Sequence, residues 1–265
     1  MRFCTLASGS KANATLVEVG ATRLLIDCGL GPRILAKRLG EAGVAPSSID
    51  ALLVTHEHID HVKGIAQAVA KWHWPVFATR GTLSGIADVP QERQHALAYD
   101  TAQAIGDCVV QLVRVPHDAA QPAAVVITAQ RSGARIGVAT DLGHVSDALG
   151  TAFERLDFLV FESNHDEDML RNGPYPPFLQ ARIASDTGHL SNRQTGGLLE
   201  RAAHRGLRHV LLAHLSQQNN EPKVALAAAK AVLKGTAFKG SLACAAQDEV
   251  TLPGASRDGQ MELGL

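Results

Sequence analysis

Ile49-Asp50-Ala51-Leu52-Leu53-Val54-Thr55 is followed directly by His56-Glu57-His58-Ile59-Asp60-His61. The first stretch is largely apolar, which predicts a buried strand. The second stretch places three His and one Asp within six residues at the end of that strand. If the backbone stays extended, the first and third residues of this run point to the same side, and a helix is predicted to begin near its end. Imidazoles and carboxylates suit Zn²⁺, Mn²⁺ or Fe, so the run predicts a metal site.

Such a site activates water when one coordination position stays open, because the ion lowers the pKa of bound water towards neutrality. A lone His is more often a surface residue than a ligand. Four potential ligands at one strand end are a far stronger signal, and they predict a water-activating metal site without defining a substrate.

Composition narrows the class of protein. The 265 residues are 46% hydrophobic and 19% charged, as expected for a folded chain with a sizeable core. A net charge of −1 argues against binding nucleic acid through bulk positive charge, so any such contact must be local and assisted by metal ions. The four Cys form no CxxC pair and are expected to be buried, reduced thiols. No signal peptide or membrane-length apolar run is apparent, so a cytoplasmic protein without a membrane partner is expected.

Predicted strands and helices continue along the chain without a linker-like segment, so a single domain over residues 1–265 is expected. The Pro/Gly-rich stretch Asn172–Pro177 is expected to form a shaped loop over a site. Ser191 is expected to cap the helix that follows it. Strands are predicted near residues 3–6, 14–19, 22–26, 49–55, 75–79, 104–115, 123–128, 135–140, 158–162 and 210–214, and helices near 32–42, 62–71, 82–86, 166–171, 192–204 and 222–233.

The pattern HxHxDH resembles the signature of the metallo-β-lactamase superfamily. This resemblance implies an α/β fold, the four-layer αβ/βα metallo-β-lactamase sandwich, with two divalent metal ions per chain (Zn, Mn or Fe). Further ligands should follow later strands, and suitable residues do stand after apolar runs at positions 117, 141 and 214. The resemblance implies one metal bound by His56, His58 and His117, a second bound by Asp60, His61 and His214, and Asp141 as a bridge between them. Asp27 matches an early Asp of the superfamily and is expected to support a metal ligand, with a turn cap as the alternative.

Five motifs spread over nearly the whole chain resemble the YycJ/WalJ-like bacterial branch, whose characterised members are DNA exonucleases working from the 5′ end. One departure is Ala12, where Gly is widespread in that branch. The resemblance implies a nucleic-acid substrate, favours DNA over RNA, and leaves the oligomeric state open. The motifs are Ser8–Asn13, Glu162–Asp166, Gly173–Pro176, Gly188–Asn192 and His214–Asn220.

The same layout is similar to that of ribonuclease Z, in which an acidic residue and a His flank the scissile phosphate. The matching positions are Glu162 and His189. His189, oriented by Glu162, is expected to donate a proton to the leaving oxygen; the alternative is a loop or cap residue. Asp60 is expected to hydrogen-bond the nucleophile as well as, or instead of, binding metal. Neither the long basic arm of ribonuclease Z nor a β-CASP insertion is apparent in the sequence.

Candidate contacts to substrate phosphate are Ser10, Lys11, His165 and Asn192. The turn at Lys11 could direct backbone N–H groups at an anion, although a solvated Lys is an equal alternative. His165 is equally compatible with simple packing, and Tyr175 is a candidate for stacking on a base.

Two other functional classes stay open. A small-molecule hydrolase, such as a thioesterase, lactonase or lactamase, would use the same fold, but the substrate loops of those branches are not recognisable. A binding module without activity is disfavoured because the ligand set is complete.

Overall fold

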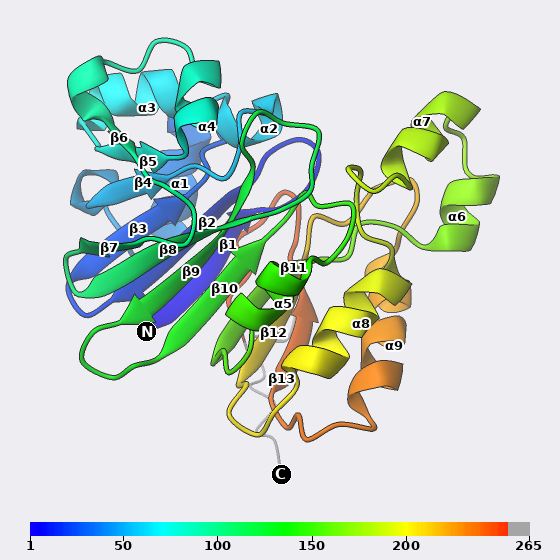
Figure 1. Ribbon diagram of the computed structural model, residues 1–265. Helices are drawn as coiled ribbons and strands as arrows, with labels where there is room; N and C mark the ends of the chain where they lie inside the picture. Colours follow the sequence, from blue (N-terminus) through cyan, green and yellow to red (C-terminus); the bar gives the residue numbers. More distant parts are fainter. Residues whose placement is uncertain (254–265) are drawn as a thin grey trace. The chain divides into compact units, whose positions relative to one another are not determined.

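The computed structural model describes residues 1–253, which divide into two compact units (Figure 1). Unit 1 comprises Met1–Arg114, Ala119–Ala134 and Ala246–Leu252. Unit 2 comprises Val115–Asp118, Arg135–Ala245 and Pro253. The single domain expected from the sequence stays a prediction. Within the described residues, every helix is too short or too polar to cross a membrane.

Unit 1 contains a six-stranded mixed sheet with the order β1-β2-β3-β4-β5-β6. The first three strands pair antiparallel, and β3 to β6 pair parallel. Strands β7, β8 and β9 pair antiparallel with one another. The strands are β1 (Arg2–Ala7), β2 (Ala14–Val19), β3 (Thr22–Ile26), β4 (Ala51–Leu53), β5 (Val76–Ala78), β6 (Gln94–Ala96), β7 (Ala102–Ile105), β8 (Cys108–Arg114) and β9 (Ala123–Ala129).

Helices of unit 1 share a core with its six-stranded sheet. Leu6, Leu25 and Leu52 of the sheet are buried in one cluster with Leu35 and Ile65 of two helices. Burial of these aliphatic side chains is the main force that holds the helices on the sheet. The helices are α1 (Pro32–Glu41), α2 (Ile59–Val62), α3 (Ile65–Trp72) and α4 (Arg80–Gly85), with 3₁₀ turns at Pro46–Ser48 and Gln91–Arg93.

Unit 2 contains four parallel strands in the order β13-β12-β11-β10. Every residue of β11 is buried, which fits its continuous apolar sequence. Helices α8 and α9 lie side by side (Figure 1), and Gly196 lets them approach closely, since a Cβ there would lie 3.0 Å from Val232. The elements are β10 (Arg135–Ala139), α5 (Asp147–Ala152), β11 (Phe158–Glu162), α6 (Glu167–Asn172), α7 (Pro177–Ile183), α8 (Asn192–Ala202), β12 (His209–Ala213), α9 (Pro222–Leu233) and β13 (Ser241–Cys244).

Parallel strands bring polar residues together at their carboxyl ends. In unit 1, Asp27 follows β3 directly and His56 comes soon after β4. In unit 2, Asp141 comes after β10, Glu162 ends β11 and His214 follows β12. The backbone is left-handed at three of these residues, with φ of 60° at Asp27, 62° at Asp141 and 53° at His214. Non-glycine residues rarely adopt this conformation, and it recurs at functional sites.

Most predicted elements are present. Strand β11 and helix α9 cover the predicted residues, and Ser191 caps α8 through a capping box with Gln194. The helix predicted from Val62 is different, because α2 ends at Val62 and α3 begins at Ile65. Gly64 lies between them, and a Cβ there would lie 1.9 Å from the carbonyl oxygen of Leu30. Four short elements were not predicted from the sequence: β6, α5, α7 and β13.

Candidate metal centre and catalytic site

Asp27 organises the ligand run of unit 1. Its carboxylate accepts hydrogen bonds from the backbone N–H of Thr55 at 2.8 Å and from the Thr55 hydroxyl at 2.9 Å. It also accepts one from Nδ1 of His61 at 2.8 Å. Asp27 and His61 are both buried. Asp27 therefore hydrogen-bonds a predicted metal ligand, and it also fixes the start of the loop that carries the run. Its role behind a bound metal stays a prediction.

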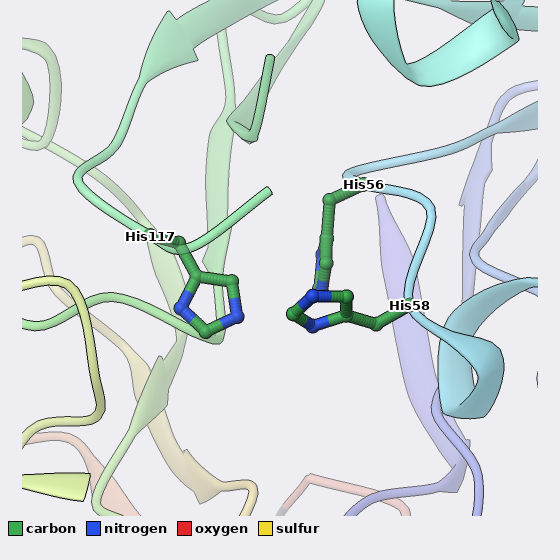
Figure 2. Close-up of side chains that lie close together, drawn as sticks. All are labelled: His56, His58 and His117. Atoms are coloured by element: carbon green, nitrogen blue, oxygen red, sulfur yellow. The ribbon is translucent and has the colours of Figure 1, made fainter. Parts of the chain in front are cut away.

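His56 and His58 are neighbours on the loop after β4 (Figure 2). Their ring centroids are 4.7 Å apart, and the rings of His56 and His61 are 4.1 Å apart. Because the Thr55 hydroxyl donates to Asp27, its oxygen is left to accept from Nδ1 of His56, which lies 3.0 Å away. The run is therefore compact, and its orientation is set by neighbouring polar groups.

Asn13 connects the predicted ligands Asp60 and His61. Its amide nitrogen lies 3.1 Å from Oδ2 of Asp60 and 2.9 Å from Nε2 of His61. The backbone N–H of Asn13 also donates to the carbonyl of Asp60 at 2.8 Å. Gly29 is packed against the same carbonyl, and a Cβ there would lie 1.8 Å from it. These contacts hold the first turn of α2 against the loop after β3.

Glu162 hydrogen-bonds two other predicted site residues of unit 2, and its side chain is fully buried. Oε1 accepts hydrogen bonds from Nδ1 of His189 and from Nδ1 of His214, each at 2.9 Å. Oε2 accepts from the backbone N–H groups of Leu142 and Leu190, each at 3.1 Å. The predicted pairing of Glu162 with His189 is present, and the carboxylate also orients a predicted metal ligand.

Asp141, Glu162, His189 and His214 form a cluster that could hold a metal ion. Oδ1 of Asp141 lies 3.5 Å from Nδ1 of His214 and 3.6 Å from Nδ1 of His189. The ring of His117 lies 5.4 Å from that of His189, measured between centroids. In unit 2, Asp141, His117 and His214 therefore lie beside the pair Glu162 and His189.

The pair has displaced pKa values. Burial raises the pKa of Glu162, but the charge of His189 and the hydrogen bonds from His189 and His214 outweigh it and hold the pKa at about 2. Burial lowers the pKa of His189, but the charge of Glu162, the hydrogen bond to it and the charge of Asp141 together raise it by more, so the net shift is upward. The pair is thus a carboxylate that stays ionised and an imidazole that keeps its proton to higher pH than usual.

The protonation of the predicted His ligands fits metal binding. A carboxylate or carbonyl can only accept, so Nδ1 must carry the proton in His61 (on Asp27), in His214 (on Glu162) and in His117, whose partner is the Gly188 carbonyl at 3.1 Å. The same holds for His56 through the Thr55 hydroxyl. In a neutral imidazole this leaves Nε2 with the lone pair that binds a metal.

Comparisons with known proteins identify the family of the chain. Residues 22–215 match the family described as the Beta-lactamase superfamily domain. The chain is 32% identical over 242 residues to exodeoxyribonuclease YycJ from Bacillus anthracis, covering 90% of this chain and 91% of that protein. The chain belongs to the metallo-β-lactamase superfamily.

One further relative supports this membership, and one solved structure shows the same fold. Exodeoxyribonuclease WalJ of Streptococcus pneumoniae is 31% identical over 230 residues, covering 84% of this chain and 85% of that one. The metallo-beta-lactamase fold protein YhfI of Bacillus subtilis has a TM-score of 0.74 at 20% identity, covering 94% of this chain and 98% of that one. The predicted α/β metallo-β-lactamase fold is confirmed, and the chain is a metal-dependent hydrolase.

The predicted phosphate contacts of this metallo-β-lactamase superfamily protein differ in accessibility. Ser10 and Lys11 are exposed on the turn after β1, and Lys11 lies 3.9 Å from Asp248. Asn192 is buried; its side-chain oxygen accepts from the Ser163 hydroxyl at 2.6 Å, and its amide nitrogen donates to Oδ1 of Asn220 at 3.1 Å. His165 is buried as well. A phosphate contact at each of the four stays a prediction.

Some supporting residues of this superfamily member were not selected from the sequence. Asn13 stands inside a motif that had drawn attention only for its turn, and Thr55 directly precedes the ligand run. A hydroxyl or amide next to a ligand motif is a usable signal, because ligands need hydrogen-bonded support. Gly188 contributes a backbone carbonyl, for which the sequence holds no side-chain signal.

Proposed function

We propose that the protein is a two-metal phosphodiesterase, most specifically a DNA exonuclease that degrades from the 5′ end. The observation that carries this proposal is the pair of the buried Glu162 and the half-buried His189, whose carboxylate also hydrogen-bonds the predicted ligand His214. An ionised carboxylate behind a protonated imidazole is the arrangement that proton donation to a leaving alkoxide requires. The names of the YycJ and WalJ relatives support DNA as the substrate.

Seven residues are the proposed metal ligands. His56, His58 and His117 would hold one divalent ion, Asp60, His61 and His214 the other, and Asp141 would bridge the two. Ions bound there would lower the pKa of bound water and stabilise charge on the phosphate. The fixed Nδ1 protons of four of the His residues support this ligand set.

The protein's own groups would perform the proton transfers. Nδ1 of His189 donates to Glu162, so the second proton of the imidazolium, on Nε2, is available for the 3′ oxygen that leaves. Asp60 would accept a hydrogen bond from the attacking water while Asn13 holds its other side. Glu162 itself keeps its charge throughout, because its pKa is far below neutrality.

The test is digestion of a 5′-phosphorylated DNA oligonucleotide with added Mn²⁺, with products resolved over time. We expect stepwise release of nucleotides by the wild type and loss of release in His58→Ala. Asp88→Ala, on an exposed turn, serves as the control and should digest like the wild type. If the wild type releases nothing in a metal-dependent way, the proposal is wrong; turnover of a thioester or lactone instead would favour a small-molecule hydrolase.

A further inference from the structure

Unit 2 contains a pocket that the proposed chemistry does not use. It has a volume of about 500 Å³ and is an open pocket lined by residues of α6, α7 and the first turn of α8, together with His165. Leu170 and Ala181 contribute apolar surface, whereas His165, Glu167, Ser191 and Gln194 contribute polar groups. The volume is within the range of small-ligand sites.

The pocket shares its loops with the catalytic pair. His165 stands three residues after Glu162, and Ser191 stands two residues after His189. These loops are paired with each other, because the backbone N–H of Asn192 donates to the carbonyl of His165 at 2.8 Å. A group bound in the pocket would therefore lie beside the segments that position the proposed proton donor.

His165 is the buried polar side chain of this pocket. It is 2% exposed, and its Nδ1 is buried without a hydrogen-bond partner among residues 1–253. Burial lowers its pKa, so the ring is neutral at pH 7 and offers one donor and one acceptor. A buried ring nitrogen without a hydrogen bond is unfavourable in free energy, so a ligand that hydrogen-bonds this nitrogen would be stabilised in the pocket.

The charges around the pocket disfavour a phosphate group in it. Glu167 lines the wall, and its Oε1 accepts from the Ser191 hydroxyl at 3.0 Å and from Nε of Arg193 at 2.9 Å. This carboxylate would repel an anion. The two lining arginines are each paired with a carboxylate, Arg193 with Glu167 and Arg171 with Asp168, the latter at 2.8 Å. An apolar wall facing neutral donors and acceptors is instead suited to a flat heteroaromatic ring with polar edges.

We propose that this pocket binds the nucleobase of one nucleotide of the substrate strand. The inference rests on the proposed nuclease function and adds a base-binding subsite to it. His165 and Gln194 would meet the polar edge of the base, and Leu170 and Ala181 would contact its face. The subsite would hold a base that has left the duplex stack, since stacked bases hide their faces.

The experiment measures direct binding of deoxynucleosides to the full chain by ¹H–¹⁵N NMR, with deoxyribose 5-phosphate as the probe that lacks a base. The first variant is Ala181→Phe, at an exposed position on α7, which fills the pocket without entering the core. The matched control is Ala227→Phe, at an exposed position on α9 outside the pocket. The second variant, His165→Leu, removes the polar ring.

We expect saturable shifts with deoxynucleosides in the wild type and in the control, and little response to deoxyribose 5-phosphate. Ala181→Phe and His165→Leu should each weaken deoxynucleoside binding about tenfold or more, the effect of losing one good base contact. Undetectable deoxynucleoside binding in the wild type overturns the inference. So does equal binding by wild type and Ala181→Phe, or preferential binding of deoxyribose 5-phosphate.

The two proposals fail separately in this design, because a deoxynucleoside contains no phosphodiester bond. Deoxynucleoside binding without digestion of DNA would overturn the nuclease proposal and leave the pocket assignment standing. Digestion by the wild type, with a KM unchanged in Ala181→Phe, would overturn the pocket assignment alone.

Discussion

Oδ2 of Asp27 lies 2.8 Å from Nδ1 of His61, and both side chains are buried. This contact keeps the proton on Nδ1 and leaves Nε2 to bind metal. We expect Asp27→Asn to weaken metal binding by about 10- to 100-fold, the usual effect of losing a carboxylate behind a ligand His. Chelator competition measures this change. Asp88→Asn is the control, because Asp88 has a similar φ of 58° in an exposed turn; equal losses in both variants would contradict the assigned role.

Gly29 tests how tightly the ligand loops are packed. A Cβ at this position would lie 1.8 Å from the carbonyl oxygen of Asp60 and 2.9 Å from the backbone nitrogen of Asn13, so the backbone must move. We expect Gly29→Ala to lower the free energy of unfolding by about 2 kcal/mol or more. Gly31→Ala, which meets no described atom within 4 Å, should change it little. Urea unfolding followed by circular dichroism compares the two, and a small effect at both positions would show that the loops are loosely packed.

Asp141 is the proposed bridge, so its loss should affect both metals. We expect Asp141→Ala to bind well under two ions per chain, as measured by elemental analysis after dialysis. The control is Arg155→Ala, because Arg155 has a left-handed φ of 56° at an exposed position and imposes the same backbone strain on Ala. If Asp141→Ala keeps two ions per chain, the bridging assignment is wrong.

The pH dependence of turnover reports on His189. Against the effect of burial, the charge of Glu162, the hydrogen bond to it and the charge of Asp141 raise the pKa of His189, so the imidazole keeps its proton to higher pH than usual and loses it as the pH rises through that raised value. We therefore expect kcat to fall on the alkaline side. Glu162→Gln should move this fall to lower pH, because burial alone lowers the pKa of the imidazole. Profiles of kcat against pH for the wild type and Glu162→Gln test the direction of this shift. If the alkaline fall of kcat stays at the same pH in the variant, His189 is not the proton donor.

The sequence was most informative where chemistry is local. His56, His58, Asp60 and His61 could be selected together because one short turn carries them. Asp27, Asp141 and His214 required the rule that parallel strands end at one edge, combined with a family resemblance. The hydrogen bond from His214 to Glu162 joins residues 52 positions apart, and no spacing rule reveals such a contact.

Short helices were harder to predict for a related reason. Helix α7 has seven residues, none of them buried, so it leaves no apolar stripe in the sequence. The Pro-rich stretch Asn172–Pro177, which leads into this helix, predicted only a loop. Prediction therefore missed the element that closes the base pocket proposed above.

The left-handed backbone at Asp27, Asp141 and His214 sets folding stability against function. Each of these residues holds a conformation that costs about 1–3 kcal/mol and that glycine would adopt freely. In a chain that no longer needs hydrolytic activity, substitution by glycine at these positions would raise folding stability. Relatives that have kept Asp and His there can on this ground be told from relatives that have become inactive, without any assay.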